Sequence, residues 1–214
     1  MTIKDSIKKI LKPFVPEMVL STLRQHQIKN EIEEWETKGC PSPPPHVVKQ
    51  NTIGEYQRKY GYSTLVETGT YMGEMVEAQK ARFKKIFSIE LGVDLFNKAR
   101  KRFYKDKNVS IVQGDSGKIL PKILRTITEP AIFWLDGHYS KGVTAKGEKE
   151  CPIFEELGAI FNSKRFNHIL LIDDARCFTG DGDYPTVDKL SEYVKWKNEQ
   201  YQIEVKHDII RCVI

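Results

Sequence analysis

Short apolar runs alternate with amphipathic stretches over most of the chain. Five such runs predict strands at 64–68, 85–90, 109–113, 131–136 and 168–173. The segments between them have helical spacing, at 74–84, 94–105, 117–127, 152–163 and 186–199, and a leading helix is expected within 46–61. Because such alternation requires crossover connections, it predicts a mainly parallel sheet that is covered by helices on both faces.

The C-terminal segment departs from this alternation. Residues 201–214 contain two strand-like runs on either side of His207 and Asp208. Such a pattern is typical of two antiparallel strands joined by a tight turn. We therefore expect a hairpin at one edge of the sheet.

The first 45 residues form a separate pattern. An apolar stripe with helical spacing runs from Ile3 to Phe14, with lysines mostly off the stripe, and Pro13 interrupts it. A second helix is predicted over 18–38, and the proline-rich run 41–45 indicates a stiff linker. The chain is thus divided into a helical extension with its linker, 1–45, and one main domain, 46–214.

Composition and charge narrow the class of protein. The chain has 214 residues, of which 40% are hydrophobic and 29% charged, so it can bury a core. It shows no apolar run long enough to cross a membrane and no signal-peptide pattern. Its four cysteines do not have CxxC spacing, so we expect a cytoplasmic protein. The net charge is +5, but six basic and two acidic residues fall within 1–29. The rest of the chain therefore lacks the excess of basic residues that is typical of proteins that bind nucleic acid.

An acidic residue lies at or just after the end of each of the five predicted strands. Ligands of parallel sheets bind outside the carboxyl ends of the strands, so these acids are candidates for one site. Each acid alone has the simpler interpretation of a helix cap or a solvated loop residue. The segments that follow the strands also include glycines, which allow close approach of the backbone to a ligand. They are Glu67-Thr-Gly-Thr-Tyr-Met-Gly73, Glu90, Gly114-Asp115-Ser116, Asp136-Gly137-His138 and Asp173-Asp174.

The succession of ETGTYMG, SIE, QGDS, WLDG and IDDAR resembles the class I S-adenosylmethionine-dependent methyltransferases. The resemblance covers about residues 46–214. It implies an α/β three-layer, Rossmann-like fold with a seven-stranded, mostly parallel sheet and an antiparallel last strand. It also implies S-adenosylmethionine as cofactor. The residues implied to bind it are Glu67, Gly69, Thr70 and Gly73 around its methionine and ribose, Glu90 at the ribose hydroxyls, Asp115 and Ser116 at the adenine, and Asp136.

A narrower resemblance, to magnesium-dependent O-methyltransferases of the macrocin and catechol types, rests on Asp136, Asp173 and Asp174. It implies that these three acids bind Mg²⁺, whose preferred ligands are oxygens. His138 is then the candidate catalytic base, with Asp136 beside it. The alternative is that Asp136 contacts only the cofactor and that Asp173 and Asp174 cap the following loop.

Two neighbouring features have open interpretations. The segment 137–151 contains three glycines and three lysines, so it is either a lid that meets an anionic group of the substrate or a solvated loop. Arg176 either holds an anionic group or neutralises the aspartates.

The leading hypothesis is methyl transfer to a hydroxyl of a small molecule or saccharide. We expect a saccharide or glycolipid precursor of glycan biosynthesis, because some sugar-modifying enzymes resemble this chain in carrying a basic amphipathic N-terminus. The alternatives are a cephalosporin-hydroxylase-like enzyme with another reaction on the same fold, and a non-catalytic cofactor-binding scaffold.

The N-terminal stripe also bears on partners and location. We expect it to pack in a homo-oligomer. The alternative is weak contact of residues 1–15 with an anionic membrane surface, which would place the protein peripherally at the inner membrane.

Overall fold

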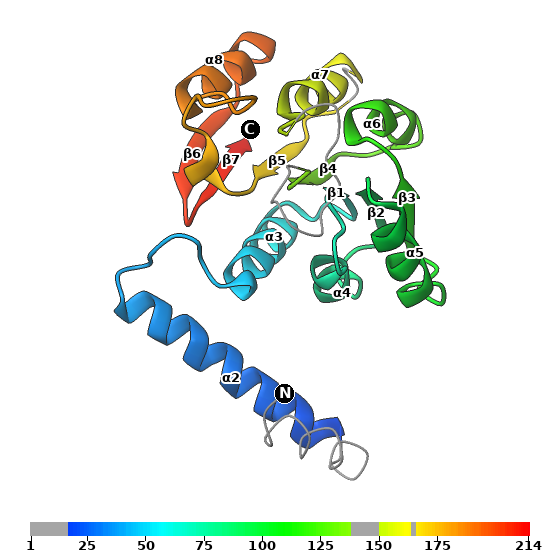
Figure 1. The fold of residues 1–214 in the computed structure, drawn as a ribbon, viewed down its shortest axis with the longest axis vertical. Coiled ribbons are helices and arrows are strands. Elements are labelled where there is room, and N and C mark those ends of the chain that lie inside the picture. Colours follow the sequence, from blue (N-terminus) through cyan, green and yellow to red (C-terminus); the bar gives the residue numbers. More distant parts are fainter. Residues whose placement is uncertain (1–16, 138–149, 164–165) are drawn as a thin grey trace.

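The computed structural model describes residues 17–137, 150–163 and 166–214. Their centre is a seven-stranded sheet with the strand order β3-β2-β1-β4-β5-β7-β6 (Figure 1). The bounds of the strands are β1 Thr64–Thr68, β2 Lys85–Glu90, β3 Val109–Gln113, β4 Ala131–Leu135, β5 Ile169–Ile172, β6 Gln202–Lys206 and β7 Ile209–Val213.

The directions of the strands confirm the predicted fold class. Strands β1 to β5 pair in parallel, whereas β7 pairs antiparallel with both β5 and β6. The turn between β6 and β7 is formed by His207 and Asp208, whose φ angles of 54° and 62° allow a tight reversal. The C-terminal hairpin is therefore present, with β6 at the edge of the sheet.

Helices cover both faces of the sheet and complete three layers (Figure 1). Helices α6, α7 and α8 lie on one face, and α3, α4 and α5 lie on the other. Their bounds are α3 His46–Tyr60, α4 Glu74–Gln79, α5 Val93–Arg102, α6 Ser116–Leu124, α7 Ile153–Ser163 and α8 Val187–Lys197, and a short 3₁₀-helix, η2, spans Ala175–Cys177.

Successive side chains of the central strands belong to different apolar cores. In β1, Leu65 packs in the core beneath α3 and α4, whereas Val66 packs in the core beneath α6 and α7. The same division separates Trp134 from Phe133 in β4, and both are fully buried, as the sequence predicts. This alternation follows from the two-residue period of a strand, and burial on both faces explains the continuous apolar runs.

Several elements are shorter than the sequence pattern predicts. Helix α4 ends at Gln79 rather than near residue 84, because the chain turns there and buries Phe83. Helix α6 likewise ends at Leu124, and Ile127 beyond it is buried. In both places an apolar residue that continues the helical spacing belongs to the turn that follows the helix.

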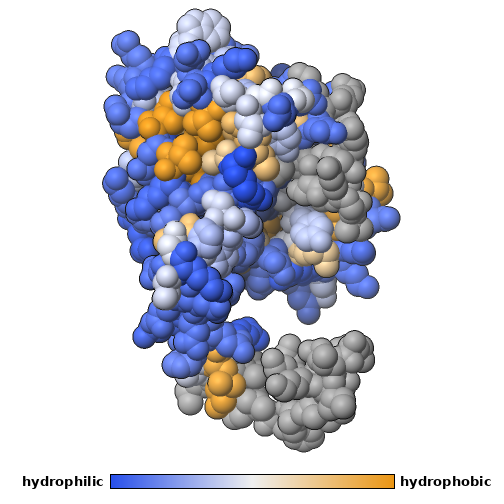
Figure 2. Space-filling view, turned by 60° about the vertical axis from the view of Figure 1, so that its left-hand side comes forward, coloured by the Kyte–Doolittle hydropathy of each residue, from blue (hydrophilic) through white to orange (hydrophobic). Residues whose placement is uncertain are grey.

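Helix α2, Glu17–Thr37, stands away from the body, and its described surface is mainly hydrophilic (Figures 1 and 2). Its C-terminal end is anchored by Trp35, which is buried and contacts the His207 ring edge-on at 5.0 Å. Residues 41–45 after it contain no helix or strand. The predicted stripe and membrane contact of residues 1–15 lie outside the described residues. Within the described part of the chain, every helix is too short or too polar to cross a bilayer.

Candidate functional site

The carboxyl ends of the central strands are aligned by hydrogen bonds that continue beyond the strands. The amide of Asp136 donates to the carbonyl oxygen of Thr68 at 3.1 Å, and the amide of Asp173 donates to that of Leu135 at 3.0 Å. Asp136 therefore extends the pairing of β4 with β1 by one residue, and Asp173 extends the pairing of β5 with β4. This register brings the acids that follow separate strands to one edge, as predicted.

Gly69 occupies the tightest position at this edge. Its φ of +85° lies in the left-handed region, and a Cβ atom added there would lie 2.3 Å from the main-chain oxygen of Asp136. Only glycine fits such a position without a shift of the backbone. The backbone of the turn after β1 therefore packs directly against the end of β4.

The side chain of Glu90 is fixed by two main-chain amides. Tyr71 donates to Oε2 and Gly92 donates to Oε1, each at 2.8 Å, and the residue is 5% exposed. Each carboxylate oxygen retains a second acceptor position. The carboxylate of Glu90 is therefore held in one orientation at this edge, and its predicted role at the ribose hydroxyls stays a prediction.

Glu67 belongs to a buried polar network rather than to an open surface. Its Oε2 accepts a hydrogen bond from Ser88, whose hydroxyl also lies 2.5 Å from that of Thr70. Burial raises the pKa of Glu67 to about 8, although the hydrogen bond from Ser88 opposes this rise. The structure thus places Thr70 in a network with Ser88 that the sequence pattern did not indicate.

The remaining sequence-predicted cofactor residues lie at the starts of two helices. Gly73 precedes α4 with a φ of +75°, and a Cβ atom there would meet the ring of Phe103 at 2.6 Å. Packing against Phe103 therefore accounts for this glycine. Asp115 and Ser116 lie where β3 leads into α6, and Ser116 is buried.

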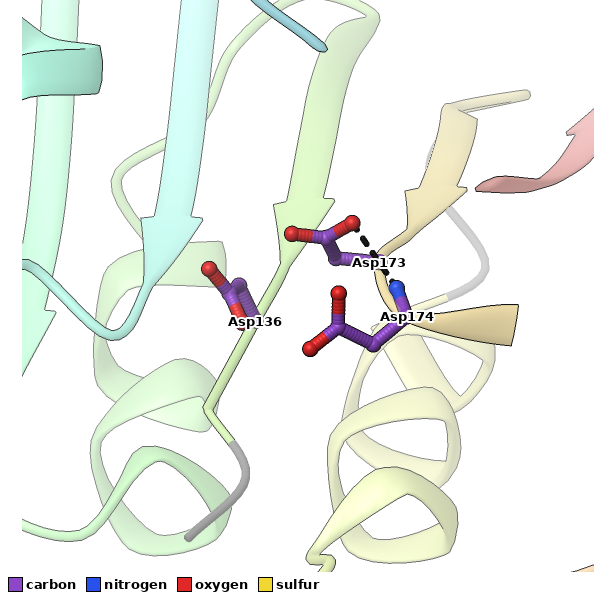
Figure 3. A group of neighbouring side chains, drawn as sticks. All are labelled: Asp136, Asp173 and Asp174. Atoms are coloured by element: carbon purple, nitrogen blue, oxygen red, sulfur yellow. Dashed lines mark hydrogen bonds between the residues drawn. The ribbon is translucent and has the colours of Figure 1, made fainter. Parts of the chain in front are cut away.

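Asp136, Asp173 and Asp174 come together at the ends of β4 and β5 (Figure 3). One carboxylate oxygen from each lies within 4.8 Å of the other two. The amide of Asp174 donates to Oδ1 of Asp173 at 2.8 Å, which fixes the relative orientation of the pair. Asp174 has a φ of 54°, so its side chain turns back toward the other two acids.

Burial and neighbouring negative charge disfavour the ionised forms of Asp136 and Asp173. Burial, followed by the charges of Asp173 and Asp174, raises the pKa of Asp136 well above its usual range. Burial and the charge of Asp174 raise the pKa of Asp173 to about 6, although Lys49 opposes this rise. The cluster is therefore a region where positive charge is strongly favoured.

Two cationic side chains already contact the cluster. Lys49, from the first turns of α3, places its Nζ 2.6 Å from Oδ2 of Asp173 and 2.9 Å from Oδ1 of Asp174. Arg176 donates to Oδ1 of Asp174 at 2.8 Å and also binds the Asp208 carboxylate. Of the two sequence interpretations of Arg176, the structure supports neutralisation of the aspartates.

Lys49 and Asp208 are members of the site that the sequence pattern did not indicate. Both lie far along the chain from the acid pair, and their local patterns gave no signal beyond an unusual lysine in the first turns of a helix. His138, the predicted base, and the lysines of the predicted lid lie outside the described residues, so their predictions stand untested.

Comparison with known proteins places the fold but not the substrate. No family model and no curated protein matches the chain. Among solved structures, it is similar to the O-methyltransferase TomG of Streptomyces achromogenes, which is involved in tomaymycin synthesis and was solved with S-adenosylmethionine. The TM-score is 0.59 at 15% identity, over 87% of this chain and 88% of that one.

Two further solved structures give the same result. An O-methyltransferase of Bacillus cereus in complex with S-adenosylhomocysteine has a TM-score of 0.57 at 10% identity, over 98% of this chain and 97% of that one. A Podospora anserina methyltransferase, also bound to S-adenosylhomocysteine, has a TM-score of 0.58 at 15% identity, over 93% and 97%. The chain therefore has the Rossmann-like fold of S-adenosylmethionine-dependent methyltransferases.

Proposed function

We propose that this protein transfers a methyl group from S-adenosylmethionine to a hydroxyl of a small molecule or saccharide, with the assistance of Mg²⁺. The observation that carries the proposal is the shared edge of β1, β2, β4 and β5. There, a glycine turn, a fixed carboxylate and three clustered aspartates lie at successive strand ends. The methyltransferase fold and the O-methyltransferases among similar structures support it.

The residues of the edge fit the cofactor. The left-handed turn at Gly69 packs its backbone against the main chain of Asp136, which sets the path of the loop that we propose meets the cofactor. Glu90, held by the amides of Tyr71 and Gly92, is oriented to accept hydrogen bonds from the two ribose hydroxyls. Asp115 and Ser116, at the start of α6, are the proposed contacts of the adenine.

The acid cluster fits a divalent cation. Three carboxylates are the hard oxygen ligands that Mg²⁺ prefers. One carboxylate oxygen from each of Asp136, Asp173 and Asp174 lies within 4.8 Å of the other two, so these three residues would hold the ion. When bound, S-adenosylmethionine supplies an electrophilic methyl group, and Mg²⁺ lowers the pKa of a coordinated hydroxyl.

Orientation of the two reactants and removal of the hydroxyl proton are the proposed roles of the protein's own side chains. Asp136, Asp173 and Asp174 hold the site of the acceptor hydroxyl beside the cofactor edge, so that the two reactants meet in one orientation. Residue His138, two positions after Asp136, is the proposed base that takes the hydroxyl proton. A saccharide or glycolipid acceptor stays a prediction from the sequence.

A labelling experiment tests the proposal. The protein is incubated with S-adenosylmethionine carrying a deuterated methyl group and with a pool of hydroxylated metabolites and glycan precursors, and products are identified by mass spectrometry. We expect labelled methyl ethers, lost on addition of a chelator and recovered with Mg²⁺. Labelled methyl on nitrogen or carbon would contradict the hydroxyl acceptor. Full activity with the chelator would contradict the role of Mg²⁺.

A further inference from the structure

Lys49 brings a positive charge into the acid cluster from a distant part of the chain. It lies on α3, which covers the face of the sheet to which Trp134 of β4 and Leu171 of β5 also point. Asp136 and Asp173 each follow one of these residues by two positions, so the period of the strand directs them toward that same face. The ammonium group of Lys49 reaches Asp173 and Asp174, and 12% of the Lys49 side chain is exposed.

The position of Lys49 is unfavourable without the acids. Removal of an ammonium group from water is costly. The residue also lies in the first turns of α3, where the positive end of the helix dipole repels cations. The ion pairs with Asp173 and Asp174, at 2.6 and 2.9 Å, offset both costs. The lysine therefore stays in place because of these two carboxylates.

The same carboxylates are the proposed magnesium ligands. A metal ion and the Lys49 ammonium would compete for Oδ2 of Asp173 and Oδ1 of Asp174, and two cations a few ångströms apart repel one another. Arg176 differs from Lys49, because it is also held by Asp208 at the β6–β7 turn. Lys49 has a flexible four-carbon stem, and within the described part of the chain its ion pairs are with Asp173 and Asp174 alone.

We propose that Lys49 is an internal cation that holds Asp173 and Asp174 together before metal binds and is displaced from them when Mg²⁺ enters. This inference rests on the magnesium site of the proposed function. Lys49 is in this view a positioning residue that sets the affinity and selectivity of the site. The ion pairs of Lys49 stabilise the metal-free protein. Because Mg²⁺ must break these ion pairs in order to bind, they also lower the affinity of the site for Mg²⁺.

Calorimetric titration with Mg²⁺ tests this proposal, supported by Mn²⁺ titration followed by electron paramagnetic resonance. Lys49→Met removes the competing charge, so the affinity for Mg²⁺ should rise about tenfold or more. Lys49→Arg keeps the charge and should bind Mg²⁺ like the wild type. Lys59→Met is the matched control, because Lys59 is exposed on the same helix.

Thermal unfolding gives a second readout. Without metal, Lys49→Met leaves clustered carboxylates uncompensated, so its melting temperature should fall below that of the wild type. Added Mg²⁺ should raise the melting temperature of Lys49→Met more than that of the wild type or of Lys59→Met. Lys49→Gln is a second neutral variant. If neither neutral variant folds even with Mg²⁺ present, the proposal is wrong, because metal should replace the lysine.

The outcomes separate this inference from the proposed function. If the wild type binds Mg²⁺ and Lys49→Met binds it with equal or lower affinity, the role of Lys49 is overturned and the metal site stands. If neither protein binds Mg²⁺ or Mn²⁺ while both bind S-adenosylhomocysteine, the metal site fails, and this inference fails with it. If only Lys49→Met binds metal, the lysine competes with the ion but is not displaced by it in the wild type, so the proposed displacement is overturned.

Discussion

The turn at Gly69 and the end of β4 at Asp136 are in direct backbone contact. A Cβ atom on Gly69 would lie 2.3 Å from the Asp136 carbonyl oxygen, closer than any side chain can approach. The proposed cofactor turn and the first proposed metal ligand are therefore one rigid unit. A change at Gly69 should disturb both.

Gly69→Ala should abolish measurable binding of S-adenosylhomocysteine, because the loop must move to admit the methyl group. The left-handed φ alone adds about 1–2 kcal/mol of strain to such a substitution. Gly61→Ala is the matched control, since Gly61 also has a positive φ of 70° but a Cβ there would meet nothing within 4 Å. Calorimetry on both variants separates strain from contact. Equal affinities in the two variants would show that Gly69 does not face the cofactor.

Glu90→Gln should weaken S-adenosylhomocysteine binding by about 1–3 kcal/mol. The substituted amide cannot accept at both atoms, so either a ribose hydroxyl or one of the amides of Tyr71 and Gly92 loses its partner. Glu74→Gln, at an exposed position of α4, is the control and should leave the affinity unchanged. The assignment of Glu90 to the ribose is lost if both variants bind like the wild type.

Glu67 should make the stability of the metal-free, cofactor-free protein fall as pH rises. Burial raises its pKa from an ordinary 4.5 to about 8 in the folded protein. Between these values the folded state keeps a proton that the unfolded state has released, so each rise in pH favours unfolding. The contribution is about 1 kcal/mol per pH unit.

Glu67→Gln removes this titration, so its free energy of unfolding should decline less steeply between pH 5 and 8. Urea unfolding at several pH values within this window measures the difference. Glu55→Gln, exposed on α3, should keep the wild-type slope. A Glu67→Gln slope equal to that of the wild type would mean that the buried carboxyl is ionised in the folded protein.

Asp174→Asn should weaken Mg²⁺ binding by about tenfold and leave the affinity for S-adenosylhomocysteine unchanged. Asparagine tolerates the φ of 54° at this position, so the backbone should keep its path. Asp188→Asn, exposed in the first turn of α8, is the control for a lost surface charge. The metal assignment is contradicted if Asp174→Asn binds Mg²⁺ as tightly as the wild type.

The strands could be predicted closely because each central one is buried on both faces. The run 64–68 has the bounds of β1, and 85–90 has those of β2. Helix ends were less predictable, since Phe83 and Ile127 continue the helical spacing although they pack from turns. The pattern records which positions are apolar, but not whether a helix or the following turn buries them.

The acids of the site could be predicted because parallel strands place their carboxyl ends at one edge. Their cationic partner Lys49 could not, because Lys49 and Asp173 are 124 positions apart and meet only when α3 packs on the sheet. Asp208 reaches Arg176 through the hairpin turn, which is likewise a tertiary contact. The hydrophobic period of a helix or strand does not determine the position at which that element packs against another one.

Calorimetric titration of the wild-type protein with S-adenosylhomocysteine tests the central claim most directly, because the product of methyl transfer needs no knowledge of the acceptor. We predict binding of one molecule per chain, with an affinity in the micromolar range and loss of that binding in Gly69→Ala. Failure of the folded wild-type protein to bind either S-adenosylhomocysteine or S-adenosylmethionine at millimolar concentration would contradict the assignment of this edge as a methyl-donor site.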